Sequence, residues 1–260
     1  MRIPSFIRKL TDPILENIPM PITGGVNRGR LWNLASSGAG YGSGRRAADQ
    51  MTLFSKLVRP GDVVWDVGAH HGYVTLCAAA RVGSEGRVHA FEPSARNRRL
   101  LQRHVDWNKL GNVTVLPFAL AATEGEARFG GTGTSKMLAL GAGDEMVSMR
   151  TADSLVASGE CRPPSFIKID VEGAEAEVLK AGAALLGPET RLIIAMHHRE
   201  ADAACTALLT AAGFRLAPSR QLAAMRTTNW DGDPDLYCAG PAWPHWDEDL
   251  TLLREAGFTG

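Results

Sequence analysis

The chain has 260 residues, of which 45% are hydrophobic, and its formal net charge at pH 7 is zero. That apolar content is enough for one sizeable core. The neutral balance and the lack of a long basic block disfavour general nucleic-acid binding, and no apolar run approaches the roughly twenty residues that cross a bilayer.

The first 44 residues form an irregular lead-in, because glycines and prolines interrupt every periodic stretch. The opening segment lacks the continuous apolar core of a signal peptide. The four cysteines are far apart and make no CxxC pair, so we expect reduced core thiols and a cytoplasmic protein. A helical period then covers residues 45–58.

Strands and helices alternate through the main domain, which we place at residues 45–240. Strands are expected near 62–67, 87–92, 112–118, 165–170, 190–197, 213–217 and 234–239, and helices near 72–81, 94–109, 173–186 and 200–212. The alternation predicts an α/β fold with a doubly wound, mostly parallel sheet and helices on both faces. Residues 241–260 form a C-terminal tail.

A Gly-rich insertion interrupts this alternation at residues 123–149. Short strand-like pieces lie near 126–129 and 145–149. The composition allows two interpretations, a flap over a pocket or a surface loop.

The most informative stretch runs from Asp62 to Gly72. An apolar strand reaches Asp66, and a turn with two glycines comes next. Gly68 and Gly72 allow the backbone to turn tightly near a ligand, and the helix that opens near Tyr73 directs its first amides to the same place. The third glycine of a dinucleotide-binding turn is missing, and an acid before the turn suits the cationic end of S-adenosylmethionine.

Two later strands also end on acids. About twenty residues after the glycines, Glu92 ends the strand at 87–92, at a place where a carboxylate typically accepts hydrogen bonds from ribose hydroxyls. The segment 165–175, Ser-Phe-Ile-Lys-Ile-Asp-Val-Glu-Gly-Ala-Glu, is a third strand with charged residues at its end.

These segments resemble the FkbM-type S-adenosylmethionine-dependent methyltransferases, over a range from about Gly40 to Gly240. The part most specific to that family is 167–175. The resemblance implies the seven-stranded Rossmann-like methyltransferase sheet, S-adenosyl-L-methionine as cofactor, and O-methylation, often of a sugar, a glycolipid or a natural product. Two positions depart from the family pattern: His70 stands where Asn is usual, and Ala195 where an acid is frequent.

Ligands of open parallel sheets bind outside the carboxyl ends of the strands, so the residues just after the strands should gather in one place. The expected cofactor contacts are Asp66, Gly68, Ala69, His70, Gly72, Glu92, Pro93, Phe118 and Ala119. Glu92 should bind the ribose hydroxyls. Phe118 and Ala119 should flank the adenine.

Methyl transfer to a hydroxyl needs an aligned acceptor and a group that removes its proton. We expect this chemistry from Asp170, Glu172 and His197, with Asp170 as the first choice for the base. Glu172 has a simpler alternative role, offsetting the dipole of the helix that begins near Gly173. Lys168 lies inside a buried strand and should pair with a carboxylate.

Histidine pairs and carboxylates at one sheet edge also resemble a divalent-metal site. The residues concerned are His70, His71, His197 and His198 with Asp170 and Glu172. Their spacing does not fix a ligand set, so we assign no metal and leave the question open.

The expected partner is a small-molecule or glycan acceptor, with no nucleic acid and no transmembrane segment, and a homo-oligomer is left open. Asn229-Trp230-Asp231 either faces the pocket or caps the core. Three other classes remain as alternatives: a nicotinamide oxidoreductase, a nucleic-acid amino-methyltransferase and a non-catalytic cofactor-binding module. The departures at His70 and Ala195 keep the last of these open.

Overall fold

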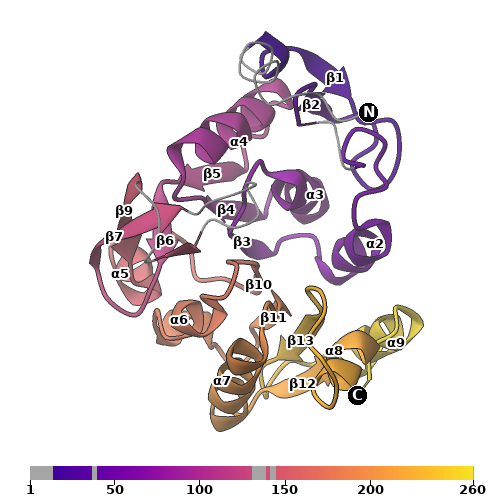
Figure 1. Cartoon of the computed structure of the whole chain (residues 1–260), viewed down its shortest axis with the longest axis vertical. Helices are drawn as coiled ribbons and strands as arrows, with labels where there is room; N and C mark the ends of the chain where they lie inside the picture. Colours follow the sequence, from indigo (N-terminus) through magenta and orange to yellow (C-terminus); the bar gives the residue numbers. More distant parts are fainter. Residues whose placement is uncertain (1–13, 37–39, 131–138, 141–144, 260) are drawn as a thin grey trace.

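The structure, a computed structural model, describes residues 14–36, 40–130, 139–140 and 145–259 (Figure 1). A seven-stranded sheet runs through its centre in the order β12-β13-β11-β10-β3-β4-β5. Neighbouring strands are parallel except at β13, which is antiparallel to both β11 and β12. The predicted doubly wound, mostly parallel fold is confirmed.

Every strand of this sheet overlaps its predicted range. The strands are β3 (Val63–Val67), β4 (Arg87–Phe91), β5 (Val113–Leu116), β10 (Phe166–Ile169), β11 (Arg191–Ala195), β12 (Arg215–Pro218) and β13 (Asp235–Ala239). All five residues of β3 are buried, as expected for a parallel strand that is covered on both faces. Because β3 lies between β10 and β4, the residues that follow it lie near the middle of the carboxyl edge of the sheet.

Helices cover both faces of the sheet (Figure 1). On one face lie α2 (Ala48–Leu57), α3 (Tyr73–Val82), α4 (Ala95–Trp107) and α9 (Trp246–Glu255). On the other lie α5 (Ala152–Ala157), α6 (Glu175–Leu179), α7 (Arg199–Ala211) and α8 (Arg220–Met225). Two apolar layers result, one on each side of the strands.

The helix predicted over 173–186 is two shorter pieces. α6 ends at Leu179, and a 3₁₀ turn lies at Ala183–Leu185. Gly182 lies between them with φ 149°, and a Cβ there would lie 2.4 Å from the Asp153 side chain. The close approach of Asp153 to the backbone explains the break, because its carboxylate accepts the amide hydrogens of Ala183 and Ala184.

A second, smaller sheet lies beside the main one. Its strands are β6 (Phe118–Leu120), β7 (Gly125–Gly130), β8 (Ala139–Leu140) and β9 (Glu145–Arg150), in the order β6-β9-β7-β8. β7 and β9 match the two short strands predicted in the Gly-rich insertion. The role of that insertion as a flap depends in part on residues 131–138 and 141–144, which lie outside the described residues.

Part of the N-terminal lead-in is regular, contrary to the predicted irregular segment. β1 (Pro19–Pro21) and β2 (Leu31–Asn33) form an antiparallel pair. The buried Trp32 ring stacks on His104 of α4 with ring centroids 3.9 Å apart. The Asn33 amide donates to Nε2 of His104 at 3.0 Å, and Nδ1 of His104 lies 2.7 Å from the His71 carbonyl oxygen. His104 of α4 therefore joins the lead-in to the turn that follows β3.

All four cysteines are free and buried, as predicted. Among the described residues, no helix combines the length and the apolar character that a membrane span requires.

A neutral His104 makes the fold sensitive to acid. Burial lowers the pKa of His104 to about 4, and the positive charge of Arg103 adds to this effect. An unfolded histidine has a pKa of about 6.5, so the folded state binds the proton less tightly. The stability that His104 contributes is complete above pH about 6.5 and is lost, by roughly 3 kcal/mol, as the pH falls towards 4.

We therefore expect His104→Gln to have a flatter profile of unfolding free energy between pH 6.5 and 4 than the wild-type chain. Urea denaturation at a series of pH values measures this. Burial also lowers the pKa of His89 to about 4, so the same measurement on His89→Gln should show a similar flattening of the profile. Parallel profiles for wild type and His104→Gln would contradict the neutral assignment.

Candidate active site

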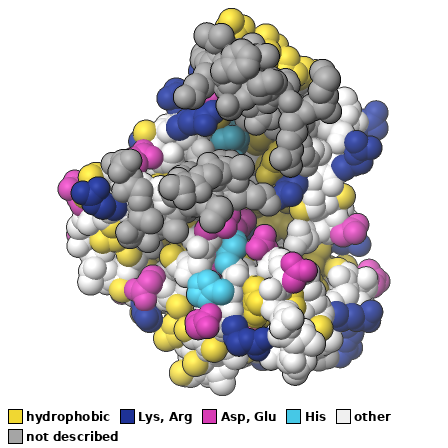
Figure 2. All heavy atoms as spheres, in the orientation of Figure 1, with side chains coloured by type: hydrophobic (Ala, Val, Ile, Leu, Met, Phe, Trp, Pro, Cys, Tyr) yellow, Lys and Arg dark blue, Asp and Glu magenta, His cyan; other side chains and the backbone are white. Residues whose placement is uncertain are grey.

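A pocket of about 480 Å³ opens at the carboxyl ends of β3, β4, β10 and β11. It is the place where the topology brings the predicted strand-ending residues together. Its wall includes Gly68, Glu92 and Asp170, each from the end of a different strand. Figure 2 shows acidic and histidine side chains gathered near the middle of the face in view.

The turn after β3 forms the floor of this pocket. Gly68 has φ 80°, and a Cβ at this position would lie 2.0 Å from the Asp170 carbonyl oxygen, so only glycine fits. The amides of Gly68 and Ala69 donate to the Phe91 carbonyl oxygen at 3.1 and 3.0 Å. His70 also lies in the left-handed region, with φ 52°. The turn is thus held against both neighbouring strands.

Glu92 closes the same turn from the end of β4. One carboxylate oxygen accepts the His70 amide at 2.8 Å, and the other accepts the Ser94 amide at 2.9 Å. The side chain is only 4% exposed, and burial raises the pKa of Glu92 to about 7. Oε1 also accepts the Asn97 side-chain amide at 3.5 Å, but Oε2 keeps a second lone pair, so Glu92 can also accept from a ligand's hydroxyl group.

Most of the predicted cofactor residues lie on the pocket wall, and two do not. The wall includes Gly68, Ala69, His70, Glu92, Pro93, Phe118 and Ala119. Asp66 instead is fully buried inside β3, where it accepts the Thr75 hydroxyl at 2.6 Å. Gly72 is the N-cap residue of α3, and a Cβ there would meet the Leu101 side chain at 2.4 Å. Asp66 and Gly72 therefore lie behind the pocket wall.

Lys168 links the two central strands at the pocket edge. Its ammonium group lies 3.5 Å from Oδ1 of Asp66 and 3.4 Å from Oδ2 of Asp170, and it donates to the Gly68 carbonyl oxygen at 3.2 Å. The expected pairing of Lys168 with a carboxylate is confirmed. One cation thus fixes the turn after β3 and the first residue after β10.

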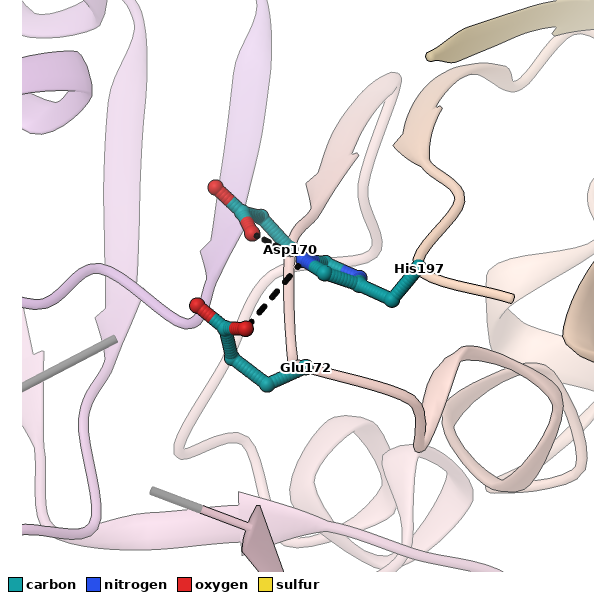
Figure 3. A group of neighbouring side chains, drawn as sticks. All are labelled: Asp170, Glu172 and His197. Atoms are coloured by element: carbon teal, nitrogen blue, oxygen red, sulfur yellow. Dashed lines mark ion pairs between the residues drawn. The ribbon is translucent and has the colours of Figure 1, made fainter. Parts of the chain in front are cut away.

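The three predicted catalytic residues form one cluster, in which the side chains point toward one another (Figure 3). Nε2 of His197 lies 3.4 Å from Oδ1 of Asp170 and 3.6 Å from Oε2 of Glu172. Asp170 and Glu172 line the pocket, and His197 approaches them from the end of β11. Glu172 has φ 53°, a strained conformation for a residue with a side chain.

Charges perturb this cluster strongly. Although burial opposes the shift, hydrogen bonds and charges from Asp170 and Glu175 raise the pKa of His197 to about 10. Burial also opposes the shift at Asp170, but Lys168 and His197 hold the pKa of that carboxyl well below its usual range. Asp170 is therefore a weak base in the ground state, and His197 is a cation at neutral pH unless another cation replaces its proton.

The pocket also has walls that the sequence patterns did not indicate. The lead-in contributes Trp32 and Tyr41, and Arg46 and Gln50 come from the segment before α2 and from α2 itself. Asp233 lies just before β13, and Asp235 is the first residue of that strand. Trp230 does not line the pocket and packs against the core. Trp32 and Tyr41 were the sequence signal for the wall formed by the lead-in, because aromatic residues are uncommon in a segment that makes no contacts.

Comparison with protein-family models matches residues 66–216 to the methyltransferase FkbM domain. The chain belongs to this family. The match covers more than half of the chain and confirms the resemblance drawn from the three strand-end segments. The family match thus assigns residues 66–216 to a methyltransferase domain.

One curated relative is the hexuronic acid methyltransferase AglP of Haloferax volcanii, which is 30% identical over 159 residues. These residues are 59% of this chain and 63% of that protein, so the chain spans less than two thirds of AglP.

Two solved methyltransferases resemble the fold at low identity. The O-methyltransferase from Bacillus cereus in complex with SAH is 17% identical at a TM-score of 0.47, with 73% of this chain and 79% of that chain covered. The precorrin-6y C5,15-methyltransferase from Geobacter metallireducens is 13% identical at 0.48, with 75% and 87% covered. The assignment rests on the family match and not on these similarities.

Loss of the Lys168 charge should leave the Asp66 carboxylate buried without a cation. We expect Lys168→Met to lower the unfolding free energy by roughly 3–5 kcal/mol, and Asp66→Asn in the same chain to restore part of it. Urea denaturation measures both.

Lys180→Met is the matched control, because Lys180 pairs with Glu177 at the surface and should contribute no more than about 1 kcal/mol. Equal losses for Lys168→Met and Lys180→Met would contradict the structural role of the Lys168 bridge.

Proposed function

We propose that this chain transfers a methyl group from S-adenosylmethionine to a hydroxyl group of a sugar, in a glycan, a glycolipid or a small natural product. One observation carries the proposal: a single pocket joins the Gly68 turn and Glu92 at one side to the Asp170 and Glu172 carboxylates at another. The relative that acts on a hexuronic acid supports a sugar as the acceptor. No observation favours the oxidoreductase alternative.

The residues of the pocket fit the cofactor. A volume of about 480 Å³ lies within the range of small-molecule sites. The backbone at Gly68 allows a close approach, Glu92 has a lone pair for a ribose hydroxyl, and Phe118 offers an apolar surface for the adenine. We assign the contacts to Gly68, Ala69, His70, Glu92, Pro93, Phe118 and Ala119. When bound, the cofactor supplies a methyl group that its sulfonium already activates.

Asp170 and Glu172 orient the acceptor in this proposal. Their carboxylates accept hydrogen bonds from sugar hydroxyls at the pocket edge, and such alignment supplies much of the acceleration of a displacement reaction. As the oxygen–carbon bond forms, the hydroxyl oxygen becomes positively charged and its proton becomes strongly acidic. A carboxylate with a low pKa can still accept that proton, and we assign it to Asp170.

Three further expectations from the sequence remain proposals. The domain boundaries at residues 45–240 are drawn from the alternation of strands and helices. The cytoplasmic location is supported by four free, buried cysteines. A homo-oligomer is kept as a proposal without support from α9, because the apolar face of this helix packs into the core of the same chain through Leu250 and Leu253.

Cofactor binding is the first test. S-adenosylhomocysteine should raise the melting temperature and NAD should not. In calorimetry, Glu92→Gln should weaken S-adenosylhomocysteine binding by about 1–3 kcal/mol, because the amide nitrogen cannot accept from a ribose hydroxyl. Glu85→Gln, at an exposed carboxylate away from the pocket, is the control. A melting shift with NAD alone would contradict the cofactor assignment.

The acceptor is found by screening with methyl-labelled S-adenosylmethionine over uronic acids, nucleotide sugars, glycolipids and small natural products. With the best acceptor, Asp170→Asn should lower kcat by roughly 10- to 100-fold while cofactor affinity stays near normal. Asp231→Asn, at an exposed position off the pocket wall, should keep full turnover. Label transfer to no hydroxyl compound, or normal turnover of Asp170→Asn, would overturn the assignment.

A further inference from the structure

We propose that Asp170, Glu172 and His197 form a divalent-cation site at the edge of the pocket. One ligand atom from each residue can be chosen so that all three lie within 4.8 Å of one another. The three residues come from the ends of two neighbouring strands, β10 and β11, and converge on the same point (Figure 3). Both carboxylates face the pocket, so the ion would be reachable from it.

The distances are close to those of a filled site. Ligand atoms that share one ion at roughly 2.1 Å lie roughly 3.0–3.4 Å from each other. Nε2 of His197 already lies 3.4 Å from Oδ1 of Asp170 and 3.6 Å from Oε2 of Glu172. Small side-chain rotations would complete the set. One imidazole nitrogen and two carboxylate oxygens suit manganese, iron or zinc.

A second observation concerns the residue that orients His197. Oε1 of Glu175 lies 2.6 Å from Nδ1 of His197, and the Glu175 side chain is fully buried. The same oxygen accepts the Gly173 amide at 2.9 Å, which fixes the carboxylate. A carboxylate on the far nitrogen is the usual arrangement for a metal-binding histidine, because it orients the ring and makes the near nitrogen a better donor. Glu175 is therefore a positioning residue.

Negative charge is concentrated around His197. Lys168 is shared between Asp66 and Asp170. Glu172 and Glu175 both face His197, which can add at most one positive charge. Glu175 is fully buried, whereas Asp170 and Glu172 are partly exposed on the pocket side, where a further positive charge would be stabilised by both carboxylates. The proton on Nε2 of His197 and the ion would compete for the same lone pair.

The role of the ion, unlike the site itself, rests on the proposed function. A divalent cation here would orient two neighbouring hydroxyls of a sugar and lower the pKa of the one that is methylated. This names a further requirement for the acceptor, a pair of adjacent hydroxyl groups. A sugar that carries only an isolated hydroxyl would be a poor substrate.

Binding of Mn²⁺ to the full chain, treated with chelator and kept free of cofactor and acceptor, tests the site directly. Electron paramagnetic resonance of free Mn²⁺ should show one ion bound per chain, displaced by Zn²⁺. His197→Asn and Glu172→Gln should each weaken binding by about tenfold or more. Glu175→Ala should weaken binding more than Glu175→Gln, because the glutamine oxygen can still accept from Nδ1.

The matched controls are the next histidine and its carboxylate, His198→Asn and Glu200→Gln. His198 lies 3.2 Å from Glu200, and neither belongs to the cluster, so both variants should bind Mn²⁺ as the wild type does. Circular dichroism checks folding. If His197→Asn fails to fold, Glu172→Gln decides the question, since the change leaves the contact between His197 and Glu175 in place.

The outcomes separate the site from the proposed function. Wild-type chain that binds S-adenosylhomocysteine but neither Mn²⁺ nor Zn²⁺ overturns the cation site and leaves the methyltransferase proposal standing. Equal Mn²⁺ binding by wild type, His197→Asn and Glu172→Gln also overturns it. One Mn²⁺ lost specifically in those variants supports the site, even if no acceptor in the screen is methylated.

Discussion

The ammonium group of Lys168 is the contact on which the rest of the site depends. It lies between the carboxylates of Asp66 and Asp170 and donates to the Gly68 carbonyl oxygen. Asp66 lies in β3, Gly68 directly after β3, and Asp170 directly after β10. These two strands pair in parallel at the centre of the sheet. Because the Asp66 carboxylate is fully buried, displacing the Lys168 charge from it would be costly, so the bridge sets the position of the Gly68 turn relative to Asp170.

Glu92 and Gly68 likewise serve two purposes each. Glu92 closes the turn through the His70 amide while its carboxylate remains on the pocket wall. Gly68 accommodates both the turn and the Asp170 carbonyl group, which would collide with any side chain. The Gly68 turn and the Asp170 side of the pocket thus share structural contacts, so a change on one side should affect the other.

Sequence patterns predicted the sheet well because parallel buried strands are continuous apolar runs, and the topology then places the residues just beyond each strand at one edge. This reasoning located Gly68, Glu92, Asp170 and His197 together. It did not show that Asp66 is buried behind the pocket wall, because adjacency in sequence does not say to which side of the strand a carboxylate turns. It also missed Trp32, whose partner His104 is distant in the chain and carries no local pattern.

The stacking of Trp32 on His104 bears on where the N-terminal boundary of the domain lies. The family match begins at Asp66, and the sheet begins at Val63. Trp32 and Tyr41 nevertheless belong to the pocket wall. A shortened chain that started at residue 45 would retain every strand of the central sheet but would lose two buried core side chains, Ile22 and Trp32, together with part of the pocket wall, so the lead-in belongs to both the core and the pocket.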